Sequence, residues 1–306
     1  MHRAKFDCSA STGVLPNLLG CGVPSGTTWH HAPFVFIHIP KASGTSAEIL
    51  LKEWRNISDS RRWARNTHLL ERIIRPPADD AKLGGRSLYI GKRSGLAERA
   101  IGGPMLMATV LREPAERILS HFNYLRARAR NPKLRSTPGL CTVTGRSANL
   151  TFSEWYAANW RRMPDINDFE VRLLVTEEAE IVRTAESASQ QVGGVGGAGC
   201  EWAPLPRVTH AHAGRALDRL KRMSLIGLTD EFERSMQTWA AALPGFESRN
   251  VKRCGNVGFQ ACGKADRATI PRELLQRIRR ENPGSYVLWT AARALFAAQE
   301  RALGAG

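Results

Sequence analysis

The sequence predicts an α/β fold, a single domain with a small parallel sheet flanked by helices. Short apolar runs occur at residues 34–39, 105–111 and 224–228. Each run is too short for a typical helix and has the mostly apolar character of a parallel strand that is buried on both faces. A segment with helical spacing of apolar residues follows each run, and this alternation of strand and helix favours a parallel sheet.

The first apolar run leads into a loop of small and hydroxylated residues at 40–46 and then into a helical pattern at 47–54. A strand, a tight loop and a helix together present backbone N–H groups and the positive end of a helix to an anion. Gly44 allows the backbone to approach a phosphate closely, and Lys41 adds a positive charge. The hydroxyl donors of this loop are Ser43, Thr45 and Ser46. The loop is therefore a candidate phosphate-binding site.

The order of residues in this loop differs from that of nucleoside triphosphate loops. Those loops place Lys after the second Gly, as G-x-x-x-x-G-K-[ST], whereas Lys41 precedes Gly44. The order Pro-Lys-x-x-Gly-Thr-Ser after an apolar strand resembles instead the 5′-phosphosulfate loop of sulfotransferases. The preceding Phe-Ile-His-Ile at 36–39 resembles the Golgi branch that sulfates glycans, such as the heparan sulfate 2-O- and 6-O-sulfotransferases. The alternative is an ordinary strand–turn–helix with a surface lysine.

A second motif follows the apolar run at 105–111. Residues 112–120 read R-E-P-A-E-R-I-L-S, with Pro114 suited to the first turn of a helix. This segment resembles the sulfotransferase 3′-phosphate motif, R-[DE]-P-x-x-R-x-x-S, and the resemblance implies that Arg112 and Ser120 hold the 3′-phosphate. A guanidinium group binds phosphate through two parallel hydrogen bonds, which suits that role. Both motifs lie at strand–helix junctions, in the order that the family has.

The other elements follow from local patterns. Thr151 and Glu154 form a capping box at the start of a helix, and Thr229 is expected to cap another. Residues 1–32 are expected to be a poorly ordered lead-in to one domain over 33–300. Flexible insertions are expected at about 131–149 and 185–206. The expected helices span residues 61–75, 114–125, 151–160, 215–223 and 229–243, and a further short strand spans residues 87–90.

Later segments add to the resemblance. Residues 168–174 resemble a segment that lines the acceptor cleft in the family, and residues 226–232 and 282–296 resemble its later segments. The resemblance extends, with gaps, from residue 34 to residue 296 and implies a P-loop-like three-layer version of the fold. An aromatic cluster either belongs to the core or stacks on a sugar face. Its members are Trp155, Tyr156 and Trp160.

Composition limits the classes of partner. The 306 residues include 44 Lys or Arg and 28 Asp or Glu, a formal net charge of +16. This excess suits nucleic acid, an acidic glycan, a membrane surface or a phosphorylated cofactor, although a coding bias toward arginine also produces it. No apolar run approaches the ~18 residues that a membrane span needs. The six cysteines are too dispersed for a zinc site, although Cys254 and Cys262 are close enough to close a local disulfide loop.

The resemblance implies a reaction and its participants. The cofactor is 3′-phosphoadenosine 5′-phosphosulfate, the sulfate donor, and the acceptor is a carbohydrate hydroxyl, with no metal and no nucleic acid involved. Lys41 and the N–H groups at 44–46 would stabilise the negative charge that develops on the leaving phosphate. The family also implies a lumenal or membrane location in the Golgi. No signal or transmembrane segment is visible in the sequence, so a soluble cytoplasmic location stays open.

The general base is the open part of this mechanism. In related glycan sulfotransferases a Gly-His pair precedes the 3′-phosphate strand, and Lys92 occupies the corresponding position here. Lys92 acts as the base with a pKa lowered by burial and by Arg93, or His68 takes the role instead. Otherwise Lys92 only binds an acidic acceptor, or the chain is a weakened or inactive copy. The rival functions are a P-loop-like phosphotransferase and a non-catalytic binder of acidic glycans or nucleic acid with a relict cofactor site.

Overall fold

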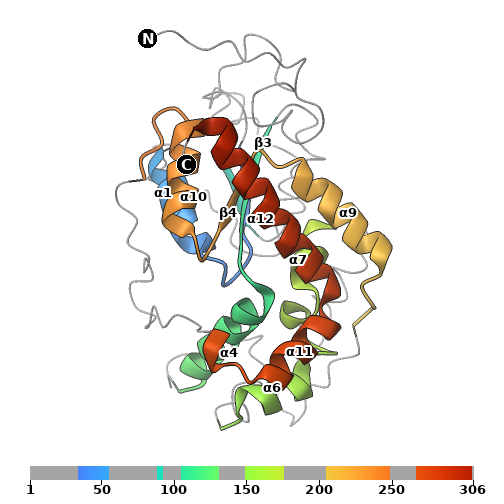
Figure 1. The fold of residues 1–306 in the computed structure, drawn as a ribbon. Helices are drawn as coiled ribbons and strands as arrows, with labels where there is room; N and C mark the ends of the chain where they lie inside the picture. The colour runs from blue at the N-terminus through green and yellow to red at the C-terminus, as the bar shows by residue number, and fades with distance from the viewer. Residues whose placement is uncertain are drawn as a thin grey trace, which may run out of the picture. The chain divides into compact units, whose positions relative to one another are not determined.

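The computed structural model describes residues 34–54, 88–91, 105–130, 149–175, 205–248 and 267–304. The chain divides into two compact units, which are described separately below (Figure 1). The first unit consists of Met1–Arg112, Leu217–Cys262 and Thr290–Gly306, and the second consists of Glu113–Ala216 and Gly263–Trp289. The lead-in at 1–32, the helix expected at 61–75 and most of the two expected insertions lie outside the described residues.

The first unit contains a four-stranded sheet whose neighbouring strands are all parallel. The strand order is β2-β1-β3-β4. The strands are β1 (Phe34–Ile37), β2 (Leu88–Gly91), β3 (Leu106–Leu111) and β4 (Leu225–Leu228). All four lie where the sequence predicts strands, with ends that differ by one or two residues. The prediction of an α/β fold with a small parallel sheet flanked by helices is confirmed.

The strand order reverses direction at β1. The strand that follows β1 in the sequence, β2, pairs with one edge of β1, and the next strand, β3, pairs with the opposite edge of β1. In open parallel sheets such a reversal leaves a crevice beyond the carboxyl ends of the two central strands, where ligands bind. The loop at 38–43 follows β1, and Arg112 follows β3 directly, so both follow the strands that flank this point.

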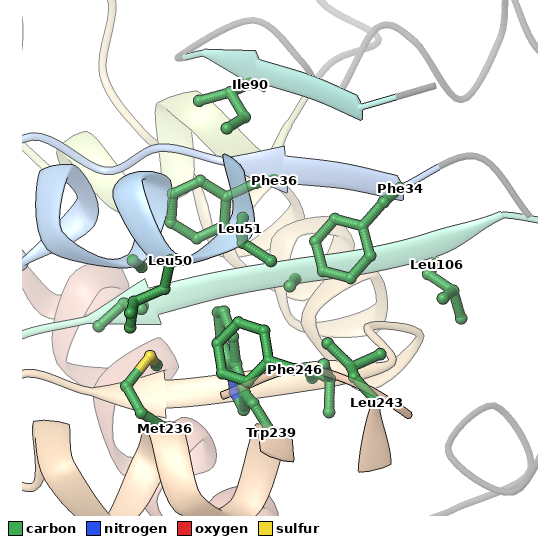
Figure 2. Packing of buried hydrophobic residues seen from close by; sticks show 14 of the residues in the cluster. Phe34, Phe36, Leu50, Leu51, Ile90, Leu106, Met236, Trp239, Leu243 and Phe246 are labelled. Carbon is green, nitrogen blue, oxygen red and sulfur yellow. The ribbon is translucent and has the colours of Figure 1, made fainter. Parts of the chain in front are cut away.

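Alternate side chains of the strands form one hydrophobic core with α1 (Gly44–Trp54) and α10 (Phe232–Ala242). Figure 2 shows Phe34 and Phe36 of β1 on the same face of the sheet as Leu50, Leu51, Met236 and Trp239. The rings of Phe36 and Trp239 meet edge to face, with centroids 6.2 Å apart. The spacing that predicted a buried helical face at Phe232, Met236, Trp239 and Leu243 is confirmed, because all four belong to this core.

The opposite face of the sheet is buried as well. Val35 and Ile37 of β1 and Met107 and Leu111 of β3 alternate with the residues of the first core, and each is at most 6% exposed. Burial on both faces is the reason that these strands are apolar throughout rather than alternating. The carboxyl-terminal half of α12 (Pro283–Leu303) contacts the sheet directly, because the side chain of Gln299 accepts a hydrogen bond from the N–H of Ile226 at 3.0 Å.

The second unit is helical, and its core is rich in aromatic side chains. Four positions of α4 that were predicted from helical spacing are buried in it: Ile118, Leu119, Phe122 and Leu125. Trp155 and Tyr156 belong to the same core, so these two aromatic residues are core residues. Trp160 is partly exposed, with the guanidinium of Arg161 over its ring. The helices are α4 (Pro114–Arg130), α6 (Phe152–Asn159), α7 (Phe169–Leu174) and α11 (Arg272–Glu281), with short 3₁₀ turns η6 (Pro164–Ile166) and η7 (Arg267–Thr269).

The two capping predictions have different outcomes. Thr151 and Glu154 form the expected capping box at the start of α6. Thr229 does not cap α10, which begins three residues later; its hydroxyl donates to the carbonyl of Leu111 at 3.1 Å. The prediction was wrong because the end of β3 offers this hydroxyl an acceptor that local sequence does not reveal. The helix expected from residue 215 is α9 (His210–Lys221), which begins earlier. Among the described helices, none is long and apolar enough to cross a membrane.

Candidate functional site

The loop between β1 and α1 contains two residues with left-handed backbone. The φ angles of Lys41 and Ser43 are 68° and 56°, in a region that residues other than glycine seldom occupy. A turn of the backbone is closed by the N–H of Ala42, which donates to the carbonyl of Ile39 at 3.3 Å. When left-handed residues alternate with right-handed ones, the backbone N–H groups form a concave surface that suits anions. Strained backbone conformations of this kind are also common at functional sites.

The first turn of α1 directs its amides toward this loop. The carbonyl of Ser43 accepts hydrogen bonds from the N–H groups of Ser46 and Ala47, at 3.1 and 3.2 Å. The N–H of Ser46 is therefore already used within the protein, whereas the amides of Gly44 and Thr45 precede the first intrahelical hydrogen bonds. The first turn contains no acidic residue. The positive end of the helix is thus not balanced by a carboxylate of its own turn, which favours an external anion.

Arg112 lies close to this loop although it is distant in the sequence. A guanidinium nitrogen of Arg112, Nη1, lies 3.4 Å from the backbone carbonyl oxygen of Lys41, and the two residues are 71 positions apart. Burial and the nearby charge of Arg112 lower the pKa of Lys41 below its ordinary value. The two like charges repel each other, so a bound anion would favour the protonated form of Lys41.

The hydroxyl residues of the loop are accessible to solvent. Ser43, Thr45 and Ser46 are each partly exposed, whereas Gly44 is buried. Together with Lys41 and Arg112, the structure therefore assembles six of the seven predicted cofactor-binding residues in the first unit. The seventh, Ser120, lies on α4 in the second unit and is partly exposed. Its role as a 3′-phosphate ligand stays a prediction.

The remaining residues of the second motif stabilise the second unit. One carboxylate oxygen of Glu113 accepts from the N–H of Glu116 at 2.8 Å and caps α4, and the other accepts from the hydroxyl of Tyr286 at 2.6 Å. The guanidinium of Arg117 is 1% exposed, forms an ion pair with Glu170 and donates to the carbonyl of Asp165 at 2.8 Å. Arg112 of the motif therefore lies beside the loop, whereas Glu113 and Arg117 make contacts that stabilise the second unit.

The segment at 168–174, which the resemblance places at an acceptor cleft, has its charged side chains turned inward. Glu170 accepts from the hydroxyl of Ser285, and Asp168 accepts from the N–H of Ser285 at 2.7 Å. Asp168 has a left-handed backbone, with a φ angle of 43°. Its carboxyl is 4% exposed, and burial raises its pKa to about 6. These interactions were not expected from the sequence, because their partners lie more than one hundred positions away.

The two candidate general bases, Lys92 and His68, lie outside the described residues. They stay predictions. Three other histidines have defined positions in the second unit: His121 packs among aromatic rings of Tyr124 and Trp155, and His210 and His212 belong to the first turn of α9. The Nδ1 atom of His212 accepts from the N–H of Thr209 at 3.0 Å, so this ring caps a helix.

Comparison with known proteins gives no family for this chain: no family model matches it, and no curated protein is significantly similar to it. The site is therefore interpreted from its own residues and from the sequence resemblance alone.

Replacing Lys41 tests whether its positive charge, partly buried beside Arg112, lowers the stability of the fold. Because the pKa of Lys41 is lowered in the folded state, its charge makes folding less favourable, and stability rises as the pH moves above that lowered pKa toward 10.5. We expect Lys41→Met to raise the melting temperature of the anion-free protein by about 2 °C and to abolish stabilisation by phosphate or sulfate. Thermal melts with and without these ions measure both. Lys221→Met is the matched control, since the Lys221 side chain is 57% exposed.

Removing Arg117 tests the structural role assigned to the second arginine of the motif. Arg117→Met leaves the buried carboxylate of Glu170 without its cation, and we expect a loss of about 3–5 kcal/mol in the free energy of unfolding. The double variant Arg117→Met/Glu170→Gln should recover most of this loss because the uncompensated charge is gone. Urea denaturation measures all three proteins. A loss below about 1 kcal/mol in the single variant would contradict the buried ion pair.

The raised pKa of Asp168 predicts a defined pH dependence. A carboxyl whose pKa is raised in the folded state stabilises the fold most at low pH, and this contribution is lost as pH rises from about 4 through about 6. Asp168→Asn keeps the acceptor oxygen for Ser285 and does not titrate. We expect the difference in unfolding free energy between native protein and variant to change by up to about 3 kcal/mol from pH 4 to pH 7. A constant difference would show that Asp168 is not perturbed.

Proposed function

We propose that the protein is a sulfotransferase that moves a sulfuryl group from 3′-phosphoadenosine 5′-phosphosulfate to a carbohydrate hydroxyl. The observation that carries the proposal is the closeness of Arg112 to the loop of Lys41. The sequence places these two cations in separate motifs, and the parallel pairing of β1 with β3 brings them to one edge of the sheet. A nucleotide with phosphate groups on both sides of its ribose needs two cationic groups at one edge of the sheet, and Lys41 and Arg112 are two such groups.

The donor set of this edge fits the proposed cofactor. It contains an ammonium group, a guanidinium group, helix amides and hydroxyl groups, which are the usual ligands of phosphate and sulfate. Lys41 and the amides of Gly44 and Thr45 would hold the 5′-phosphate and stabilise the charge that develops on its bridging oxygen. The guanidinium of Arg112 would hold the 3′-phosphate, and the assignment of Ser120 to the same phosphate rests on the sequence motif alone. When bound, the cofactor supplies an activated sulfuryl group for in-line transfer.

The transfer also needs an acceptor and a base. The acceptor hydroxyl loses its proton to a base while its oxygen binds the sulfuryl group, and 3′-phosphoadenosine 5′-phosphate leaves. Lys92 and His68 are the candidate bases from the sequence. The carbohydrate nature of the acceptor rests on the resemblance to glycan sulfotransferases, which covers residues 34–296.

Titration with 3′-phosphoadenosine 5′-phosphate tests the cofactor assignment without requiring the acceptor. At a concentration about 100 times its Kd, we expect this nucleotide to raise the melting temperature by about 5 °C or more, and we expect ATP to have little effect. Lys41→Ala and Arg112→Ala should each reduce the shift, while Lys221→Ala and Arg301→Ala, exposed residues of the same unit, should not. Stabilisation by ATP alone would favour a phosphotransferase instead.

Turnover separates an enzyme from a binding protein with a relict site. Radiolabelled sulfate donor and a panel of polysaccharides measure transfer directly. Lys41→Ala should abolish turnover, whereas Arg112→Ala should mainly raise the KM for the donor because its guanidinium acts on a phosphate remote from the transferred group. Nucleotide binding without transfer to any polysaccharide would leave the non-catalytic binder. Full rates in both Lys92→Ala and His68→Ala would exclude both bases.

A further inference from the structure

His38 occupies the space that a side chain at position 44 would fill. It directly follows β1, and its ring packs against the start of α1. A Cβ atom at Gly44 would lie 2.4 Å from Cδ2 and 2.7 Å from Nε2 of this ring. A Cβ atom this close would clash with the ring, so the ring of His38 can occupy this position only because residue 44 has no side chain. On the strand side the ring of Phe36 lies 6.0 Å from it.

The ring of His38 is fixed from its other edge by Glu48. The Nδ1 atom lies 3.3 Å from Oε2 of Glu48, and Oε1 of the same carboxylate lies 3.0 Å from Nζ of Lys52. Burial alone would raise the pKa of Glu48, but the hydrogen bonds from His38 and Lys52 lower it below its ordinary value. Glu48 is thus ionised at neutral pH and holds the imidazole from a position one turn beyond Gly44. The carboxylate and the glycine together fix the plane of the ring.

We infer that His38 is a positioning residue that, held by Glu48, fixes the backbone of residues 41–44 in its anion-binding form. Two residues of this loop, Lys41 and Ser43, have left-handed backbone, and such conformations persist only where surrounding contacts hold them. His38 directly follows β1 and contacts Glu48 in the second turn of α1, so the contact joins the elements on the two sides of the strained segment. The identity of the anion rests on the proposed function, whereas the bracing of the loop does not.

The variants separate the contact with Glu48 from the bulk of the ring. His38→Ala removes both, Glu48→Gln removes the charge, and His38→Asn keeps an N–H donor near the position of Nδ1. Glu53→Gln is the matched control, because Glu53 is an exposed carboxylate on the same helix. We expect the Kd for 3′-phosphoadenosine 5′-phosphate to rise about 10-fold or more in His38→Ala and less in Glu48→Gln. His38→Asn should return to within about 3-fold of the native protein, and Glu53→Gln should match it.

Hydrogen exchange of the nucleotide-free protein provides the second measurement. We expect the amides of Ser46 and Ala47, which donate to the carbonyl of Ser43, to exchange about 10-fold faster in His38→Ala and Glu48→Gln, with no change in Glu53→Gln. Unchanged exchange in His38→Ala would overturn the inference whether or not the nucleotide binds. Equal losses of affinity in His38→Ala and His38→Asn would overturn it too, because the ring would then matter only for its volume. Failure of the native protein to bind the nucleotide would instead reject the proposed function, and the exchange data would still decide the role of His38.

Discussion

The parallel pairing of β1 with β3 is the constraint on which the candidate site depends. In this register Ile37 lies opposite Thr109, and the Thr109 hydroxyl donates to the Ile37 carbonyl at 2.9 Å, a side-chain contact that adds to the backbone ladder. Both strands therefore end at the same edge of the sheet, and the residues that follow them become neighbours. Lys41 and Arg112 are close for this reason alone. The fully buried side chains on both faces of the two strands keep the register, because a slip by one residue would exchange the two faces.

The edge of the sheet concentrates features that do not favour stability. Lys41 is partly buried beside a second cation, two residues of the loop have left-handed backbone, and the first turn of α1 lacks an acidic residue. Two buried charges elsewhere in the described chain have ion-pair partners: Arg117 pairs with Glu170 in the second unit, and the buried Glu300 pairs with the exposed Arg234 in the first. Several such features gathered at one place are typical of a functional site.

The second motif shows that residues adjacent in sequence need not share a task. Arg112 ends the first chain segment of the first unit and contacts the loop, whereas Glu113 begins the second unit and caps α4. Arg117, which the motif includes, is buried and bound to Glu170. Only Arg112 and Ser120 were assigned to the cofactor from the sequence, and these two are partly exposed while Glu113 and Arg117 are buried. The two residues assigned to the cofactor are thus the accessible ones, and the two with contacts inside the second unit are the buried ones.

The sequence by itself determined the strands and most helices, because apolar runs and helical spacing act over a few neighbouring residues. It also predicted an anion-binding loop from glycine, lysine and hydroxyl residues, and that part stays a prediction. It did not determine the hydrogen bond from Arg112 to Lys41 or the ion pair of Arg117 with Glu170. It also did not reveal that the hydroxyl of Thr229 donates to the end of β3 and does not cap α10. The bracing of the loop by His38 and Glu48 was missed as well, although the spacing of Glu48 and Lys52 marks a helical ion pair. Most of these contacts join residues far apart in the chain. Strand order and packing decide which distant groups meet, and no local pattern contains that information.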